Sequence, residues 1–280
     1  NSRRVRCGED RMVNPIKNVH GERLDFTFHP GAPGATQLAI IGHGVTGHKD
    51  RPFLVALAEG LAGAGIPALR VSWSGNAGSE GRFADCTISK EVADLGAVLD
   101  ACAGYTVTYV GHSMGGKAAM RLVMDRPDLV ARLTVVDIAP RAYSDRVRVE
   151  FGAMNALDLS AVTSRKDAEA KLAAQVPEWG MRQFILTNLG QDAEGHWRWT
   201  VNREALTNSL PEILGNSLAV GEVWDGPTRF LRGGKSSYIR DEDLAAIHAH
   251  FPRADVITLP DSGHNPHFEA RAGFVEATLA

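Results

Sequence analysis

The sequence is poor in cysteine and has no long apolar run, and both absences limit what the protein can be. Its 280 residues contain three cysteines, Cys7, Cys86 and Cys102, an odd number at wide spacing that suits neither a disulfide scaffold nor a zinc site. No stretch approaches the ~18 apolar residues of a membrane span, and the basic start NSRRVRCGEDRM is not followed by the apolar part of a signal peptide. We therefore expect a cytoplasmic protein with reduced thiols and a trimmed N-terminus.

A strong charge of either sign is also missing. The formal net charge is -3, and lysines and arginines are scattered along the chain. This balance provides no electrostatic footprint for nucleic acid or for an anionic membrane surface, so we expect a small-molecule partner. With 44% hydrophobic residues, the chain is long enough for one large α/β domain that encloses a site. The sequence carries no signal for an oligomeric state.

Strand-like and helical segments alternate along most of the chain, which is typical of βαβ units and a mainly parallel sheet. Apolar, β-rich runs occur at 24–28, 37–41, 67–73, 106–110, 133–138, 228–232 and 254–259. Helical spacing of apolar residues occurs between them, at 53–65, 91–103, 116–124 and 244–251. The sequence therefore predicts an α/β fold with helices flanking a central sheet.

This alternation stops between residues 141 and 223, where helical patterns dominate and a short WRWTV is a possible strand. We interpret 141–223 as a helical cap inserted after the sixth strand, and 1–140 together with 224–280 as the α/β core. Four tryptophans fall in this segment or at its exit: Trp179, Trp197, Trp199 and Trp224. They either form the small apolar core of the insertion or line a substrate pocket beneath it.

The motif Gly111-His112-Ser113-Met114-Gly115 carries the strongest chemical signal. It fits G-x-S-x-G, follows a β-rich strand and leads into a helical pattern, which is the context of a nucleophile elbow. The two glycines leave room for a tight turn that exposes Ser113. The Met114 amide then lies at a helix N-terminus, where developing negative charge is favoured. We expect Ser113 to be a nucleophile and His112 to contact the substrate; a glycine-rich turn with an incidental serine is the alternative.

A serine hydroxyl needs a base to remove its proton, and His264 is the candidate. It lies in LPDSGHNPHF, after the last predicted strand, and it follows the serine in chain order as the elbow motif requires. An ordinary surface histidine is the alternative. His267, His248 and His250 have no third ligand at a recognisable spacing, so we expect no metal site.

A second glycine-rich segment, AIIGHGVTGHKD, has two interpretations. The glycines of GHGVTG satisfy G-x-G-x-x-G after a strand, which is the pattern of a dinucleotide-binding turn. That interpretation requires an acidic residue at the end of the next strand, but PALRVSW ends in serine and tryptophan. We favour the other interpretation, in which His43 and Gly44 place the Val45 amide opposite the Met114 amide so that both donate to an oxyanion.

Four motifs in order, GHSMGGKAAM, VVDIAP, FLRGGKSSYI and FPRADVITLPDSGH, resemble the YbfF/ABHD11-like esterase and thioesterase subgroup of the α/β-hydrolase superfamily. This resemblance covers residues 105–270. IGHGVTGHKDRPFLVALAEGL and VSWSGNAGSEGRF, in the first part of the chain, are instead similar to the serine-aminopeptidase-like bacterial α/β-hydrolases. Both likenesses imply the α/β-hydrolase fold.

The acid that should orient the base is missing from its usual place. Many hydrolases of this fold carry it after the seventh strand in a pattern like G-x-x-D, where this chain has Gly233-Gly234-Lys235-Ser236. Asp137 closes the strand predicted beside the nucleophile strand, and adjacent strands are only ~4.8 Å apart, so its carboxylate can reach the histidine loop. The resemblance implies that Ser113, Asp137, Ser236 and His264 act together. A structural role for Asp137, a plain turn role for Ser236 and four rival acids stay open: Asp225, Asp241, Asp243 and Asp261.

Taken together, these residues predict a hydrolase of carboxylic esters or acyl thioesters with small to medium acyl groups. The expected route is an acyl-enzyme formed on Ser113 with His264 as base, and it requires no cofactor. A carbon-carbon bond hydrolase or a perhydrolase on the same scaffold is an alternative. A ligand-binding protein that keeps the fold without turnover is an alternative of another class.

Overall fold

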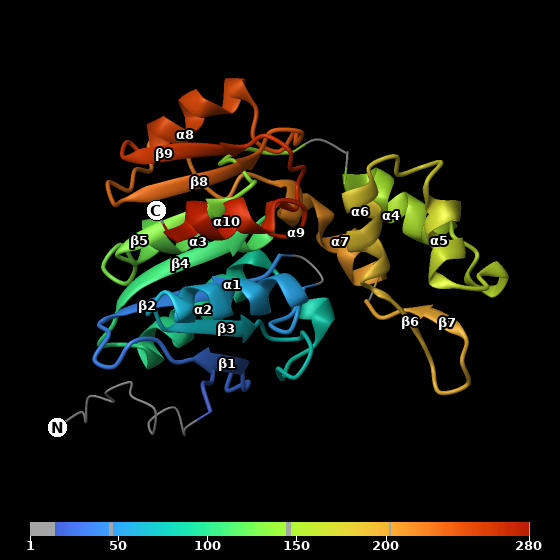
Figure 1. Ribbon diagram of the computed structural model, residues 1–280, viewed down its shortest axis with the longest axis horizontal. Helices are drawn as coiled ribbons and strands as arrows, with labels where there is room; N and C mark the ends of the chain where they lie inside the picture. The colour runs from blue at the N-terminus through green and yellow to red at the C-terminus, as the bar shows by residue number, and fades with distance from the viewer. Residues whose placement is uncertain (1–14, 45–46, 144–146, 202, 280) are drawn as a thin grey trace. The chain divides into compact units, whose positions relative to one another are not determined.

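The computed structural model describes residues 15–44, 47–143, 147–201 and 203–279. The chain divides into two compact units (Figure 1). The core unit consists of Asn1–Arg141 and Asn216–Ala280, and the inserted unit is Ala142–Gly215. No helix within the described ranges is long and apolar enough to cross a lipid bilayer.

The core unit is built on a seven-stranded sheet. Its strands are β1 (Asp25–His29), β2 (Gln37–Gly42), β3 (Ala68–Ser72), β4 (Thr106–His112), β5 (Arg132–Val136), β8 (Thr228–Gly233) and β9 (Ala254–Leu259). They lie in the order β1-β3-β2-β4-β5-β8-β9, and every pair is parallel except β1 with β3. β2 and β3 are almost entirely buried, as expected for parallel strands covered on both faces.

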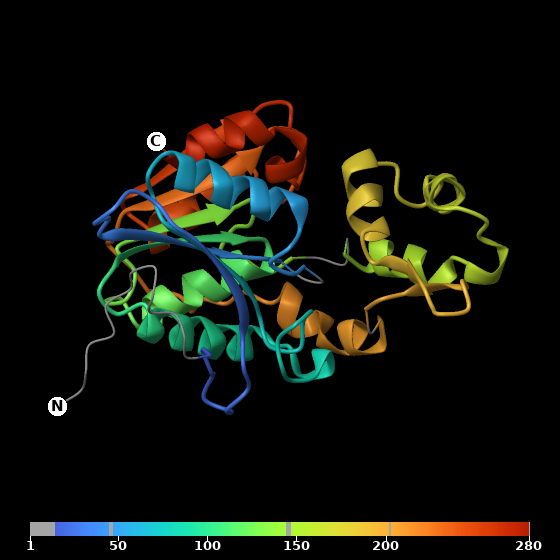
Figure 2. The same cartoon turned by 60° about the horizontal axis from the view of Figure 1, so that its bottom comes forward.

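Helices cover both faces of this sheet. α1 (Pro52–Gly63) and α10 (Arg271–Leu279) lie on one face, whereas α2 (Ile88–Ala101) and α3 (Met114–Asp125) lie on the other (Figures 1 and 2). Local sequence determines where they start: α1 begins with a proline, whose missing amide costs nothing in a first turn, and Thr87 caps α2 by accepting a hydrogen bond from the Lys90 amide. The unit also contains α8 (Leu244–His250), α9 (Pro266–Glu269) and 3₁₀ turns at Phe83–Asp85 and Asp241–Asp243.

Apolar side chains of the sheet pack against those of α1 and α10. The buried cluster includes Ile41, Leu57, Val110, Leu231 and Phe274. Burying one side chain of this size contributes about 1.5–3 kcal/mol to the stability of the fold. This packing holds the sheet strands firmly in place.

The inserted unit is mainly helical and has an apolar core of its own. It contains α4 (Val147–Ala156), a 3₁₀ turn (Leu159–Ala161), α5 (Arg165–Leu172), α6 (Trp179–Leu186) and α7 (Arg203–Leu214). A small antiparallel hairpin pairs β6 (Leu189–Gln191) with β7 (Trp197–Trp199). Its core includes Met154, Leu172, Ile185 and Trp199.

The seven predicted strands form the sheet, and the predicted helices of the core appear within a few residues of their expected limits. Two expectations need correction. Five sheet strands, not six, precede the insertion in the described part of the chain. The insertion ends at Gly215 rather than 223, because the next segment is tied to the core unit: Arg121 of α3 donates to the Ser217 carbonyl and pairs with Glu222 at 2.8 Å. The β6 strand carries no clear sequence signal and was not predicted.

Candidate active site

The candidate site lies where the parallel strands of the core unit end. Ser113 follows β4, Asp137 follows β5, Ser236 follows β8 and His264 follows β9. In an open parallel sheet these carboxyl ends share one edge, which is where such sheets bind ligands. Ser113 and His264 are 151 positions apart in the sequence, and the sheet brings them within hydrogen-bonding distance.

Ser113 occupies a strained turn between β4 and α3. Its φ of 54° and ψ of -119° lie in a region that non-glycine residues rarely adopt, and such strain is concentrated at functional sites. The flanking glycines are required: a Cβ at Gly111 would lie 2.6 Å from the Gly115 carbonyl oxygen, and one at Gly115 would lie 2.7 Å from that of His43. The turn thus presents the partly exposed Ser113 hydroxyl at the edge of the sheet.

His264 lies between Ser113 and Asp137. Its Nε2 is 3.2 Å from the Ser113 Oγ, and its Nδ1 is 2.9 Å from Asp137 Oδ2. Because a carboxylate only accepts hydrogen bonds, Nδ1 carries the proton and Nε2 is left to accept from the serine hydroxyl. The imidazole therefore has the tautomer that a general base needs.

Asp137 is completely buried, and three donors surround its carboxylate. Oδ1 accepts from the Gly233 amide at 2.9 Å, while Oδ2 accepts from His264 and from the Ser236 hydroxyl. Asp137 also has a positive φ of 49°, one of three such non-glycine residues described. β5 ends at Val136, so Asp137 lies just beyond the strand that was predicted to include it. This turn aims its side chain across β8 toward the histidine loop.

Ser236 takes the position where the acid was expected and hydrogen-bonds to the acid instead. Its hydroxyl donates to Asp137 and accepts from the Tyr238 amide at 3.1 Å. The close approach of this loop to the histidine loop requires glycine, since a Cβ at Gly233 would lie 2.0 Å from the Gly263 carbonyl oxygen.

The four rival acids lie elsewhere. Asp225 is exposed, Asp241 pairs with Arg232 at 2.7 Å, Asp243 pairs with Arg141 at 2.8 Å, and Asp261 faces Lys235 at 3.5 Å. His264 Nδ1 donates its hydrogen bond to Asp137. Among the candidate acids, the geometry therefore selects Asp137.

The loop after β2 lies directly against the elbow. A Cβ at Gly44 would lie 3.1 Å from the His112 carbonyl oxygen, so glycine eases the close approach. Two hydrogen bonds of the His43 ring fix the loop after β2. Its Nδ1 donates to the Gly44 carbonyl at 2.9 Å, and its Nε2 accepts from the Trp73 amide at 3.1 Å. Burial lowers the pKa of His43 to about 4, so it stays neutral. Val45, the expected oxyanion donor of this loop, lies outside the described residues.

Met114 is the first residue of α3, so its amide is at the helix N-terminus as predicted. The first amides of a helix have no intrahelical acceptor, and the helix dipole is positive there. This amide follows Ser113 directly, and its position would let it donate to an anion beside that residue.

His112, which is predicted to contact a substrate, has a buried side chain. The ring is 6% exposed, and its Nε2 donates to the His264 carbonyl oxygen at 3.0 Å. Its centroid lies 5.0 Å from that of His264 and 4.3 Å from that of His267, whose ring in turn contacts that of Phe53 at a tilt of 40°. His112 thus connects the elbow to the backbone of the histidine loop. Burial lowers the pKa of His112 to about 3 and that of His267 well below its ordinary value.

The four tryptophans are not gathered at one place. Trp199 is 9% exposed, and its Nε1 donates to the Met154 carbonyl inside the inserted unit. Trp197 packs against the same cluster, and Trp224 is 6% exposed against Phe251 in the core unit. Trp199 and Trp224 are thus buried within their own units, whereas Trp197 is partly exposed. Trp179, on α6, is 53% exposed.

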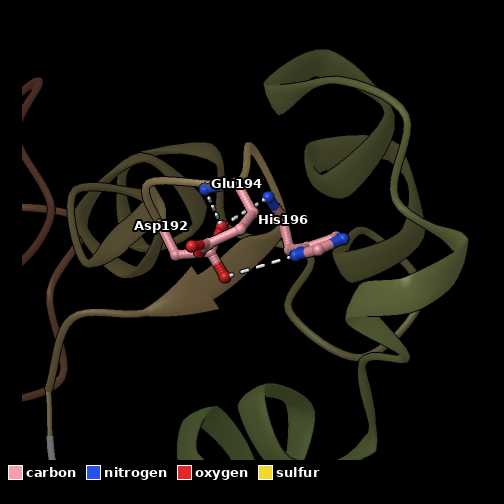
Figure 3. A group of neighbouring side chains, drawn as sticks. All are labelled: Asp192, Glu194 and His196. Carbon is pink, nitrogen blue, oxygen red and sulfur yellow. Dashed lines mark hydrogen bonds and ion pairs between the residues drawn. The ribbon is translucent and has the colours of Figure 1, made fainter.

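One group of side chains in the described residues has a metal-like spacing, and it lies on the hairpin of the inserted unit. Asp192, Glu194 and His196 are on the β6–β7 turn (Figure 3). Asp192 Oδ1 accepts from the amides of Glu194 and His196, and Oδ2 faces the His196 ring at 3.4 Å. The aspartate closes this tight turn, which accounts for the arrangement. His248 and His250 lie on α8, where His250 hydrogen-bonds to the Glu222 carbonyl.

Sequence reasoning missed Tyr238. Its ring stacks on that of His264, with centroids 3.6 Å apart and an interplanar angle of 15°. Its place two residues after Ser236 was the available signal, but nothing in the sequence shows which way a ring in that loop points.

Comparisons with known proteins show the family and the fold. The model of the "Alpha/beta hydrolase family" matches residues 30–277. The sn-1-specific diacylglycerol lipase ABHD11 of Danio rerio is 32% identical over 286 residues, covering 99% of this chain and 87% of the relative. Esterase YbfF of Escherichia coli K12 is 35% identical over 177 residues, covering 63% of this chain and 67% of the relative. A solved marine microorganism esterase has a TM-score of 0.78 at 27% identity, covering 91% of this chain and 98% of that structure.

The predicted YbfF/ABHD11-like subgroup is confirmed, and the likeness is wider than expected. It extends into the first part of the chain, which had been matched to another branch of the superfamily. With the parallel sheet, the elbow after β4 and a family match over most of the sequence, the chain belongs to the α/β-hydrolase family.

Proposed function

We propose that this protein hydrolyses carboxylic esters or acyl thioesters with Ser113 as nucleophile. The observation that carries the proposal is the line of hydrogen bonds from Ser113 Oγ to His264 Nε2 and from His264 Nδ1 to Asp137. Relatives named as an sn-1-specific diacylglycerol lipase and as an esterase support ester substrates. In this proposal, the Asp137 carboxylate supplies the negative charge that faces His264, and the Ser236 hydroxyl holds that carboxylate by a hydrogen bond.

In the proposed acylation step, His264 Nε2 takes the Ser113 proton while Oγ attacks the acyl carbon. The carbonyl electrons move to the oxygen, and the Met114 amide at the start of α3 donates to that oxyanion. The Val45 amide is proposed as the second donor. His264 then passes its proton to the departing alcohol or thiol, which leaves an acyl group on Ser113.

Deacylation repeats these steps with water. His264 removes a proton from a water molecule, the resulting hydroxide attacks the acyl carbon, and the proton returns to Ser113 as the acid leaves. The positive charge that His264 carries in both steps faces the buried Asp137 carboxylate.

The inserted unit is proposed to be the helical cap of this hydrolase, and the acyl group is proposed to be small or medium in size. The chain leaves the core unit at Arg141, shortly after Asp137, so the insertion begins at the edge of the sheet that carries the candidate site. The buried Trp199, with the partly buried Trp197 packed against it, belongs to the apolar core of that unit.

A fluorophosphonate probe and a substrate panel test this function together. We expect one probe molecule to attach to each protein, at Ser113 in the peptide map, because the elbow presents its hydroxyl to the base. Labelled protein should lose hydrolysis of p-nitrophenyl esters and acyl-CoA thioesters of graded chain length. The ratio of the two substrate series decides between ester and thioester. Protein that neither reacts with the probe nor turns over any member of the panel would be a binding protein instead.

The pH dependence of kcat/KM should show one ionisation between roughly pH 5.5 and 7.5, with activity lost as the pH falls. The base must be neutral to accept the Ser113 proton, and histidine ordinarily titrates in this range. His43 and His112, with pKa values of about 4 and 3, stay neutral throughout the window and add no second step. A flat profile, or full activity in His264→Ala, would rule out His264 as the base.

A further inference from the structure

The ring of Tyr238 lies on the face of the proposed base in an unusual way. The centroids are 3.6 Å apart and the planes differ by 15°, so the rings overlap almost fully. Two neutral aromatic rings prefer offset or edge-on contact at 4.5–7 Å, because direct overlap brings their negative faces together. A cation over an aromatic face is attracted instead. The stack therefore suits a protonated imidazolium better than a neutral imidazole.

Two carboxylates lie near His264: Asp137, and Glu269 of α9, which accepts hydrogen bonds from the Gly263 and Asn265 amides on either side of the histidine. Asp137 faces Nδ1 with its carboxylate, and Ser113 faces Nε2 with a neutral hydroxyl. The rings of His112 and His267 lie on the elbow and on α9, and burial keeps both neutral because it lowers their pKa values far below the working range. Of the groups that contact the imidazole ring itself, Asp137 supplies a full negative charge and Tyr238 an electron-rich face.

The loop that carries Tyr238 is fixed in place. The Tyr238 amide donates to the Ser236 hydroxyl, which itself donates to Asp137. Arg141 donates to the Ser237 carbonyl at 3.3 Å and pairs with Asp243, and the side chain of Ile239 is 2% exposed. One short loop thus supplies a hydroxyl to the acid and a ring to the base.

We propose that Tyr238 is a positioning residue for His264: its ring holds the imidazole plane in line between Ser113 and Asp137 and stabilises the imidazolium by a cation–π contact. The inference rests on the proposed function. It assigns to the loop after β8 a second contribution besides the Ser236 hydroxyl.

Two substitutions distinguish the effect of the Tyr238 aromatic face from the effects of its hydroxyl and of its volume. Tyr238→Phe keeps the aromatic face and should retain kcat/KM within about threefold of wild type, whereas Tyr238→Leu keeps much of the bulk and should lose roughly 3- to 30-fold. Leucine cannot stabilise the imidazolium, so the acid limb of the Leu profile should also move to lower pH, by about 0.4 to 1.5 units.

The direction of that movement distinguishes the proposal from simple packing. A ring that only excluded water would disfavour the charged form, so its removal would move the acid limb to higher pH. A Leu variant with an unchanged profile, or one moved upward, would overturn the inference. Equal urea midpoints for the two variants show that both are folded.

A measurement that needs no turnover keeps this test separate from the proposed function. The NMR titration midpoint of the His264 imidazole, assigned by its loss in His264→Gln, should fall in Tyr238→Leu and hold in Tyr238→Phe. Wild-type protein without esterase activity would refute the proposed function, while the titration would still decide the role of Tyr238. An active wild type with equal midpoints in all variants would refute the role of Tyr238 alone.

Discussion

Ser113→Ala should lose at least about 10⁴-fold in kcat while its fold and stability stay close to wild type. The loss is large because nucleophile, base and acid act as a unit, and removing the hydroxyl leaves His264 nothing to activate. The cost in stability should be small, since the Ser113 side chain makes no cap hydrogen bond to α3 and alanine differs from serine by one atom. The elbow glycines that allow the turn stay in place.

Steady-state kinetics on the best ester of the panel measure this effect, with urea unfolding as the check on folding. Ser160→Ala is the matched control, because Ser160 is an exposed serine of the inserted unit that bonds to Asp158. It should keep wild-type turnover. Purified Ser113→Ala with near wild-type activity would leave the proposed mechanism without its nucleophile.

Asp137→Asn should lose about 10⁴-fold in kcat, whereas Ser236→Ala should lose about tenfold. Asparagine tolerates the positive φ of position 137, so the change removes the charge with little backbone strain. An amide can donate to His264 Nδ1 and so favours the wrong tautomer, and it does not balance the imidazolium. Ser236→Ala removes one hydrogen bond to an acid that keeps two other donors, Gly233 and His264.

A carboxylate returned to the usual place provides the complementary test. Ser236→Asp in the Asp137→Asn background should recover part of the lost rate, because Ser236 and His264 contact the same oxygen of Asp137. In the wild-type background the same change should reduce activity, since two adjacent carboxylates repel each other and one pKa rises. If Asp137→Asn keeps its activity while Ser236→Ala is inactive, the acid that orients His264 must be another residue.

Several features of this protein could be predicted because they are local in the sequence. The alternating apolar runs predict the parallel sheet, since each strand of a covered sheet must be apolar on both faces. The elbow is local as well: a strand, two glycines around Ser113 and a helix define the turn without reference to the rest of the chain. Chain order indicated His264. Strand adjacency pointed to Asp137 but left four other acids open.

Tertiary structure decided what depends on contacts between distant segments. The choice of Asp137 required β8 to lie beside β5, so that Gly233 and Ser236 could donate to a buried carboxylate. The His112 ring was found to support the loop that carries His264, because it donates to a carbonyl oxygen 152 positions away. Residues 216–223 joined the core unit through Arg121, an ion pair that no local pattern encodes. The stack of Tyr238 on His264 depends on side-chain direction in two loops, which only the packed sheet fixes.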